Sequence, residues 1–417
     1  MSSKIKNILK EELKKISLSP KELKEIKKSA DEFVKKISTA DKKIKVEIGG
    51  SLAKETLIKK NKQDVDVFVV FENETATTNL EKILKKAKLD FEVVHGSRDY
   101  FKVYDNKTDI VFEIIPVVEN KNPSEANNVT DVSLKHVKYV KHKLNKNKKL
   151  VDEIKLAKAF CHGCDVYGAE SYIQGFSGYA LECLIIYFGG FEKFLRRIKK
   201  TKFIDLEKYF KNGKEAMREI NKSKLQSPFV LVDPTYKYRN VVAGLSLETF
   251  NKFLECAERF LKSPSVNAFE KENVDDFVFG MKDFAKNKKI NFIEVEFETD
   301  RQEGDIAGTK MKKFFDFVVS SLERKQQEIL MKKFYYLGEG KNAKGFLVLK
   351  EKNEIDVRGP SVKMKEAVSR FKKCNKKTFV KKGFVWKKEK VDLEEVFNFL
   401  KNFENEIGVC FKVLSDF

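Results

Sequence analysis

Apolar and polar positions near the start of the chain first follow a helical period and then the alternation of strands. Ser19-Pro20-Lys21-Glu22 is a capping box with proline in the first turn, which predicts a helix running to about Ile37. Short runs rich in valine and isoleucine follow, and they predict strands. These runs are IKVEIGG, DVDVFVVF, FEVVHG, DYFKVY and TDIVFEIIPVV, the last closed by Pro116. We therefore expect a mixed α/β fold here.

Beyond the loop ENKNPSEANNVTDVS the pattern becomes largely helical. Residues 132–162 alternate apolar and basic positions at helical spacing, and ALECLIIYFGGFEKFLRRIKK predicts another helix after the connection YGAESYIQGFSGY. A strand and loop then precede a helix from about Ser246 to Leu261.

The character of the sequence changes again at KSPSVNAFEKENVDD. Two strand–helix patterns follow, and then a basic, hairpin-like stretch, TFVKKGFVWKKEKV. The whole chain is expected to be an α+β multidomain protein: a mixed-sheet head, a helical central domain, and a C-terminal α/β body and tail. The boundaries that we predict are 1–130, 131–265 and 266–417.

Charge adds a prediction about partners. The 417 residues contain 84 Lys and Arg but only 63 Asp and Glu, a net charge of +21. This excess favours a polyanionic partner, nucleic acid first and an anionic membrane second, although lysines can also simply coat a solvated surface. The longest apolar stretch, YALECLIIYFGGF, is too short to span a bilayer and contains Glu182, so no membrane-spanning segment is expected. Nucleic acid, and no membrane, is therefore the partner that we predict.

No secretory signal is visible, and the six cysteines are scattered, which favours a reducing, cytoplasmic location. Cys161 and Cys164 form a CxxC, but no second pair lies at zinc-finger spacing.

The stretch GGSLAKETLIKKNKQDVDVFVVF carries the candidate chemistry. Side chains alternate along a strand, so Asp64 and Asp66 project from one face, where two carboxylates suit Mg²⁺. Gly50-Ser51 lies after a strand and before an expected helix, where the backbone can approach a phosphate, and Lys54, Thr56 or both could add contacts. Asp-x-Asp alone would equally fit a solvated strand edge. With Gly-Ser at this distance, we interpret it as a nucleotidyltransferase metal site.

A two-metal phosphoryl-transfer site usually needs a third carboxylate. The run TDIVFEIIP offers two candidates, because Asp109 and Glu113 fall on one face, separated by Val111. From the residues alone, either could complete the site.

Several blocks together resemble a known family. The Gly-Ser and Asp-x-Asp motif is shared by the DNA polymerase β-like nucleotidyltransferases. The blocks HVKYVKHKL, KAFCHGCDVYGAESYIQGFSGYALECLIIYFGGF, VDPTYKYRNVVAGLS and VRGPSVKMKEAVSRF resemble archaeal (class I) CCA-adding enzymes, the tRNA nucleotidyltransferases. The resemblance runs from about residue 45 to 260, and more weakly to 370.

The resemblance implies roles for particular residues. Asp64, Asp66 and Glu113 would be catalytic and would hold two Mg²⁺ ions; the family usually has Asp at the third position, and Asp109 remains the alternative. Nucleotide-binding roles are implied for Gly50, Ser51, Lys54, Asp131, His136, Lys158, Tyr167 and Arg239. Among these, Lys158 and Tyr167 would contact the triphosphate, and Arg239 would read the base edge. The arginine expected within VTDVS is absent, which indicates a divergent member.

The implied function is template-independent addition of C, C and A to the 3′ end of tRNA from CTP and ATP, with release of pyrophosphate. The head would be a polymerase β-like nucleotidyltransferase domain, and the C-terminal region would grip the acceptor stem and T-arm of the tRNA. Homodimers are common in the family. The alternatives are an enzyme like poly(A) polymerase or oligoadenylate synthetase, which would use ATP only, and an inactive RNA-binding homologue.

Overall fold

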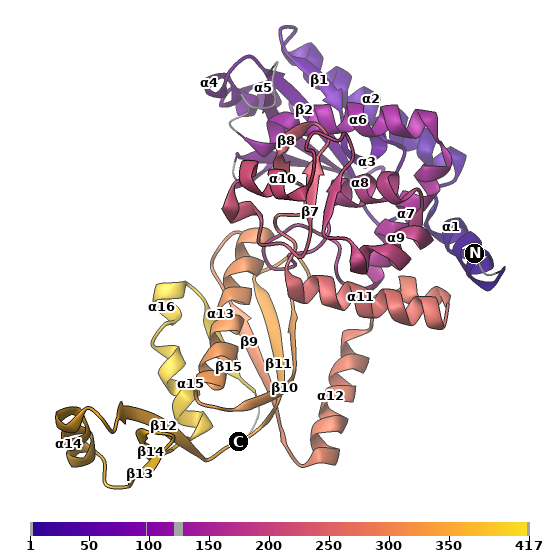
Figure 1. Ribbon diagram of the computed structural model, residues 1–417. Coiled ribbons are helices and arrows are strands. Elements are labelled where there is room, and N and C mark those ends of the chain that lie inside the picture. The colour runs from indigo at the N-terminus through magenta and orange to yellow at the C-terminus, as the bar shows by residue number, and fades with distance from the viewer. Residues whose placement is uncertain (1–2, 97, 121–127, 415–417) are drawn as a thin grey trace. The chain divides into compact units, whose positions relative to one another are not determined.

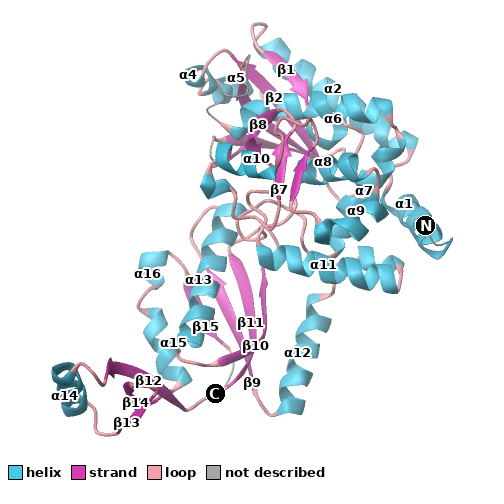
Figure 2. Cartoon of the chain, viewed as in Figure 1, coloured by secondary structure: helices cyan, strands magenta, loops and turns pink. Residues whose placement is uncertain are grey.

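The structure is a computed structural model that describes residues 3–96, 98–120 and 128–414. The chain divides into two compact units, Met1–Lys271 and Glu272–Phe417, each of mixed α/β composition (Figures 1 and 2). Part of the predicted loop between the head and the helical region, residues 121–127, lies outside the described residues.

A five-stranded sheet of order β1-β2-β5-β4-β3 organises the start of the first unit (Figure 1). The two central strands run parallel and the outer pairings are antiparallel. The strands are β1 (Lys45–Ile48), β2 (Gln63–Phe71), β3 (Glu92–Val94), β4 (Tyr100–Asp105) and β5 (Ile110–Val118). All five strands predicted from the apolar runs are thus confirmed.

Helices α2 (Pro20–Ala40) and α5 (Leu80–Lys86) share one core with this sheet. The capping box at Ser19 is present as predicted, and the helix extends to Ala40. Val65 and Val67 of β2 are fully buried in this core. Because strand side chains alternate, the aspartates of β2 project from the opposite face of the sheet.

The prediction that Pro116 closes its strand is wrong. β5 continues to Val118, paired with β2. Pairing with β4 ends at Ile114, so the missing N–H of Pro116 breaks no ladder hydrogen bond on that side. The carbonyl oxygen of Pro116 accepts a hydrogen bond from Arg98 Nη1 at 3.1 Å.

The rest of the first unit is mainly helical, and its core is rich in phenylalanine. The ring of Phe160 alone contacts those of Phe191, Phe253, Phe260 and Phe269, and such pairs add about 0.5–1.5 kcal/mol each beyond their buried area. The helices around this core are α1 (Ser3–Ile16), α6 (Ser133–Lys146), α7 (Lys149–Gly163), α8 (Gly178–Phe188), α9 (Phe191–Arg197) and α11 (Leu247–Lys262).

Short elements complete this unit. A three-stranded sheet of order β6-β7-β8 comprises β6 (Phe203–Asp205), β7 (Val230–Asp233) and β8 (Tyr236–Asn240). The short helices are α3 (Gly50–Ala53), α4 (Glu74–Thr77), α10 (Gly213–Glu219), η2 (Val129–Val132), η3 (Ile198–Lys200), η4 (Lys222–Lys224) and η5 (Val266–Phe269).

The second unit contains a four-stranded antiparallel sheet of order β10-β11-β9-β15. Its strands are β9 (Asn291–Glu298), β10 (Glu328–Tyr335), β11 (Asn342–Lys350) and β15 (Cys410–Val413). Helices α13 (Asp305–Arg324) and α15 (Leu393–Lys401) share a core with one face, and α12 (Val274–Lys288) with the other. The alternation on β11 fits both faces, because Leu347 joins the first core and Phe346 the second.

A second sheet of order β12-β14-β13 lies in the same unit, next to helix α14 (Figure 1). Its elements are β12 (Glu354–Ser361), α14 (Lys365–Cys374), β13 (Thr378–Lys381) and β14 (Phe384–Lys390); α16 (Glu404–Ile407) lies near the C-terminus. The predicted basic hairpin is confirmed as β13–β14. No described helix is long and apolar enough to cross a membrane.

Candidate active site

Three carboxylates meet at the centre of the head sheet. Asp64 and Asp66 lie on β2, and Asp66 is aligned with Glu113 across the parallel ladder to β5. Aligned residues on parallel strands share a face, so the three side chains form one cluster, which we call the carboxylate cluster. Asp109, the alternative third carboxylate, precedes the strand with φ 52°, and the alternation of faces does not extend to it.

Two carboxyl groups of the carboxylate cluster have a raised pKa. Burial raises the pKa of Asp66, and the charge of Asp64 adds to the rise. Burial followed by the charge of Asp66 raises the pKa of Glu113. Lysines partly compensate: Lys60 Nζ lies 2.8 Å from Asp64 Oδ2, and Lys102 Nζ lies 3.4 Å from Glu113 Oε1.

A glycine turn brings the chain against this cluster. The N–H of Gly49 donates to the carbonyl of Asp66 at 2.8 Å, and α3 begins at the next residue. Gly50 has φ 55°, a left-handed conformation that glycine adopts readily. A side chain at Gly49 would collide with Phe68, since its Cβ would lie 2.0 Å from the ring.

Two lysines converge on one buried acid. Lys54 Nζ lies 2.7 Å from Glu182 Oε2, and Lys158 Nζ lies 3.0 Å from Glu182 Oε1. Glu182 is fully buried; burial opposes its ionisation, but the two lysines outweigh it and its pKa lies below the usual range. Burial lowers the pKa of Lys158, which Glu182 partly restores. The hydroxyl of Thr56 completes the network, 2.9 Å from Lys158 Nζ.

These groups line a common cavity of about 220 Å³. Asp64 and Asp66 form one part of its wall and the two lysines another, and the ring of Tyr167 stacks on His162 with centroids 3.9 Å apart. The predicted residues that line the cavity are Gly50, Ser51, Lys54, Asp64, Asp66, Lys158 and Tyr167. Carboxylates and cations therefore face one space large enough for part of a nucleotide.

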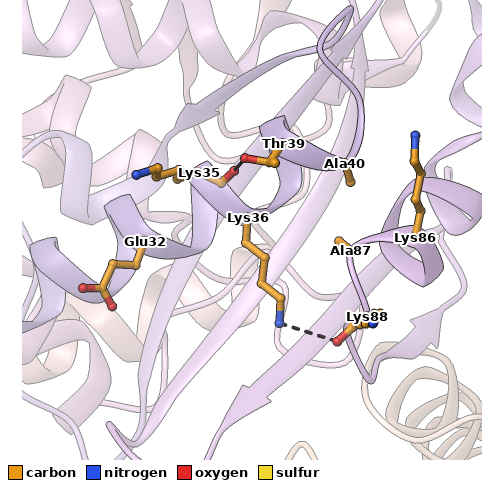
Figure 3. A pocket seen from close by; sticks show the side chains of 8 residues that line it. All are labelled: Glu32, Lys35, Lys36, Thr39, Ala40, Lys86, Ala87 and Lys88. Atoms are coloured by element: carbon orange, nitrogen blue, oxygen red, sulfur yellow. Dashed lines mark hydrogen bonds between the residues drawn. The ribbon is translucent and has the colours of Figure 1, made fainter.

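A larger cavity of about 520 Å³ lies between α2 and the end of α5, but it lacks this chemistry. Its polar lining is mostly lysine, and Figure 3 shows Lys35, Lys36 and Lys86 pointing in different directions. Lys36 Nζ instead reaches the carbonyl oxygen of Lys88 at 3.5 Å (Figure 3). We therefore place the candidate active site in the smaller cavity.

His136 and Arg239 lie in a second cluster, which Asp233 joins. Asp233 Oδ2 accepts from Arg239 Nη1 at 2.8 Å and lies 3.0 Å from His136 Nε2. Its Oδ1 accepts from the hydroxyls of Tyr179 and Thr235 at 3.0 and 2.8 Å. Burial opposes ionisation of Asp233, yet these partners hold its pKa below the usual range, and burial lowers the pKa of His136.

Asp131 is engaged elsewhere. It forms an ion pair with Arg98 and accepts from the N–H of Val118 at 2.8 Å and of Asn128 at 3.2 Å. These contacts fix the end of β5 against η2. Four predicted site residues are not among those that line the cavity: Glu113, Asp131, His136 and Arg239.

The sequence did not predict two buried acids that hold other site residues in place, Asp233 and Glu182. Both belong to blocks that carry the family resemblance, but neither is assigned a role in the site from the sequence. A lone acid in an apolar helix requires a buried cation, and that signal could have linked Glu182 to Lys54 or Lys158.

The carboxylate cluster fits a divalent cation. No three described His, Cys, Asp or Glu side chains already form a compact metal site. However, burial raises the pKa of Asp66 and of Glu113, and repulsion from the neighbouring carboxylates raises both further. Carboxylate oxygens are the ligands that Mg²⁺ prefers, so a cation here would relieve that repulsion.

Comparisons with known proteins point to one family. The domain described as "tRNA nucleotidyltransferase, second domain" matches residues 152–270, and the second messenger oligonucleotide or dinucleotide synthetase domain matches residues 3–154. The CCA-adding enzyme of Nanoarchaeum equitans is 35% identical over 289 residues, which is 68% of each chain.

Other relatives agree. The CCA-adding enzyme of Saccharolobus islandicus is 33% identical over 63% of this chain and 61% of its own, and that of Pyrococcus abyssi is 31% identical over 70% and 64%. Among solved structures, the Cid1 poly(U) polymerase bound to MgATP has a TM-score of 0.51 at 14% identity, over 65% of this chain and all of its own. That likeness establishes a shared fold.

Proposed function

This chain belongs to the CCA-adding enzymes, a family of tRNA nucleotidyltransferases, and we propose that it adds C, C and A stepwise to the 3′ end of tRNA from CTP and ATP. Each addition would release pyrophosphate and use no nucleic-acid template. The matched regions leave about a third of each relative's length uncovered.

The observation that carries the proposal is the joint lining of one cavity by Asp64, Asp66 and the lysines. Nucleotidyl transfer needs positive charge around the triphosphate and carboxylates around the reacting oxygens. We assign Asp64, Asp66 and Glu113 as ligands of two Mg²⁺ ions. When bound, these ions would lower the pKa of the attacking hydroxyl and offset charge on the leaving pyrophosphate.

The remaining residues would bind and orient the nucleotide. Lys54 and Lys158 would contact the triphosphate, while Glu182 holds both ammonium groups at the cavity wall. Ser51 would also contact the triphosphate. It lies at the glycine turn, where the lack of a side chain on Gly50 lets a phosphate approach the backbone. Tyr167 would close the far side of the cavity, supported by the ring of His162.

Arg239 and His136 would select the base. The guanidinium is held by Asp233 at 2.8 Å, which leaves further N–H groups for a base edge. Asp131 would act by fixing the turn that leads into α6, since its carboxylate is engaged by Arg98 and two backbone N–H groups.

We further propose that residues 1–130 act as the catalytic head, 131–265 close over the nucleotide, and 266–417 bind the acceptor stem and T-arm of the tRNA. The net charge of +21 and the basic β13–β14 hairpin support contact with a phosphate backbone.

The test is an extension assay. The protein is incubated with Mg²⁺, tRNA lacking its 3′ CCA, and each labelled nucleotide alone or CTP paired with ATP, and product lengths are read on a gel. We expect two additions from CTP and one terminal A when ATP is present. A long ladder from ATP alone would indicate a poly(A) polymerase, and no extension would indicate an inactive RNA-binding homologue.

A further inference from the structure

Two cysteines outside the cavity lie at the packing contact between α7 and α11. Cys164 caps the C-terminus of α7 and is 6% exposed, and Cys256 packs partly buried against the same core. An ion pair confirms that these segments adjoin, because Lys252 Nζ lies 3.3 Å from Asp165 Oδ2. Lys252 and Cys256 are four residues apart on one helix face, so Cys256 faces the end of α7.

The surroundings of Cys256 favour its thiolate. Arg259 Nη2 donates to its sulfur at 3.4 Å. A hydrogen bond from the Cys164 thiol lowers the pKa of Cys256, and Arg259 and then Lys252 lower it further against the effect of burial. The pKa of Cys164 is raised by the same hydrogen bond and by burial. Cys256 contacts a guanidinium and is less buried than Cys164, so we expect it to be the sulfur that reacts first.

We propose that Cys256 is an oxidation site for hydroperoxides and that Cys164 is its resolving partner. The Cys256 thiolate attacks a peroxide oxygen; an S–O bond forms, the O–O bond breaks, and the leaving oxygen takes a proton as water or an alcohol. Cys256 is oxidised to a sulfenic acid while the peroxide is reduced. The Cys164 sulfur then attacks Cys256, an S–S bond forms, and the hydroxyl leaves with the Cys164 proton as water.

The site adjoins a segment of the cavity wall. Cys164 lies three residues before Tyr167, which lines the cavity. All six cysteines are free thiols in this structure, and the described residues include no cluster that would commit these sulfurs to a metal. The pair is therefore available for thiol chemistry.

Two other cysteines provide an internal reference for reactivity. Cys374 and Cys410 are exposed, whereas Cys256 is partly buried. The full chain is treated with iodoacetamide at pH 7, and each cysteine's modification rate is followed by peptide mass spectrometry. We expect Cys256 to react about tenfold faster than the references, because the thiolate is the reactive form and Arg259 contacts the sulfur of Cys256. Faster reaction of Cys374 and Cys410 would overturn the proposal.

A second experiment tests the partner. Hydrogen peroxide should produce a peptide pair joined through Cys164 and Cys256 in a non-reducing digest. In Cys164→Ser the disulfide should be absent, and a cyclic 1,3-dione should trap sulfenic acid at Cys256. Arg259→Gln should slow alkylation of Cys256 toward the reference rate without changing the thermal unfolding midpoint. Disulfides formed only by Cys374 or Cys410, or an unchanged rate in Arg259→Gln, would contradict the assignment.

Discussion

A Cβ atom placed on Gly50 would lie 1.6 Å from Oδ2 of Asp66. The backbone of the glycine turn therefore occupies the space directly against the buried carboxylate, and Asp66 in turn holds that turn by accepting from the N–H of Gly49 through its carbonyl. Gly50 and Asp66, which belong to the two parts of the sequence motif, thus pack directly against each other.

Replacing this glycine should damage both the site and the fold. Gly50→Ala would place a side chain at φ 55° and displace Asp66, so we expect a loss of about 1–2 kcal/mol in the free energy of unfolding. Displacement of a reacting group by about 1 Å costs roughly 100-fold in rate. Denaturant unfolding and the extension assay measure the two effects. Gly244→Ala is the matched control, because nothing lies within 4 Å of its Cβ position; equal loss in both variants would contradict the role of Gly50.

The third carboxylate can be identified by paired substitutions. Glu113→Gln should reduce extension at least about 1,000-fold, because a neutral amide cannot replace a metal-binding carboxylate in transfer. Asp109→Asn should retain activity, since Asp109 is exposed and lies before the strand. Extension rates with a fixed tRNA decide between them. Loss of activity in Asp109→Asn with retention in Glu113→Gln would reverse the assignment.

Removing the charge of Glu182 should destabilise the protein. Glu182→Gln leaves Lys54 and Lys158 buried without their counter-ion, and breaking one side of a buried ion pair costs about 3–5 kcal/mol. Urea unfolding at pH 7 measures this loss. Glu258→Gln, in an exposed pair with Lys199, is the control and should leave the midpoint unchanged.

The same residue gives a pH dependence with a defined sign. The pKa of Glu182 is below its ordinary value of 4.5, so its stabilising contribution is fully present above pH 4.5 and is lost as the pH falls through the folded-state pKa. The stability difference between wild type and Glu182→Gln should therefore shrink below pH 4.5. A difference that stays constant from pH 7 into this range would show that the charge of Glu182 is not what stabilises the network.

Much of the fold followed from local patterns, and the site followed only in part. The alternation in DVDVFVVF placed Asp64 and Asp66 on one face, and the parallel ladder aligned Asp66 with Glu113. The prediction that Pro116 ends its strand was wrong, because proline ends a strand only where a neighbouring strand would accept a hydrogen bond from its N–H. The pairing of β4 with β5 ends at Ile114, before Pro116. The sequence did not show which distant residues form ion pairs with each other. Lys54 and Glu182, for example, are 128 residues apart. A single sequence carries no record of such pairing.

We expect Asp233 to influence base selection by orienting Arg239. This prediction rests on the proposed role of Arg239 in reading the base. Asp233→Asn replaces one acceptor of the cluster by an amide, so Arg239 Nη1 and His136 lose their charged partner. We expect the preference for CTP over UTP to fall about tenfold, because a hydrogen bond to a charged group contributes about 1.5 kcal/mol. Extension rates with each nucleotide at equal concentration provide the ratio.

Two further variants make this prediction specific. Arg239→Lys keeps the charge but not the planar fork, and should lower the same ratio. Thr235→Val removes only a hydroxyl donor to Asp233 Oδ1 and should change the ratio less, because the contacts at Oδ2 remain. If Asp233→Asn folds with an unchanged ratio while Arg239→Lys loses discrimination, Asp233 stabilises the segment without orienting the arginine, and base selection depends on Arg239 alone.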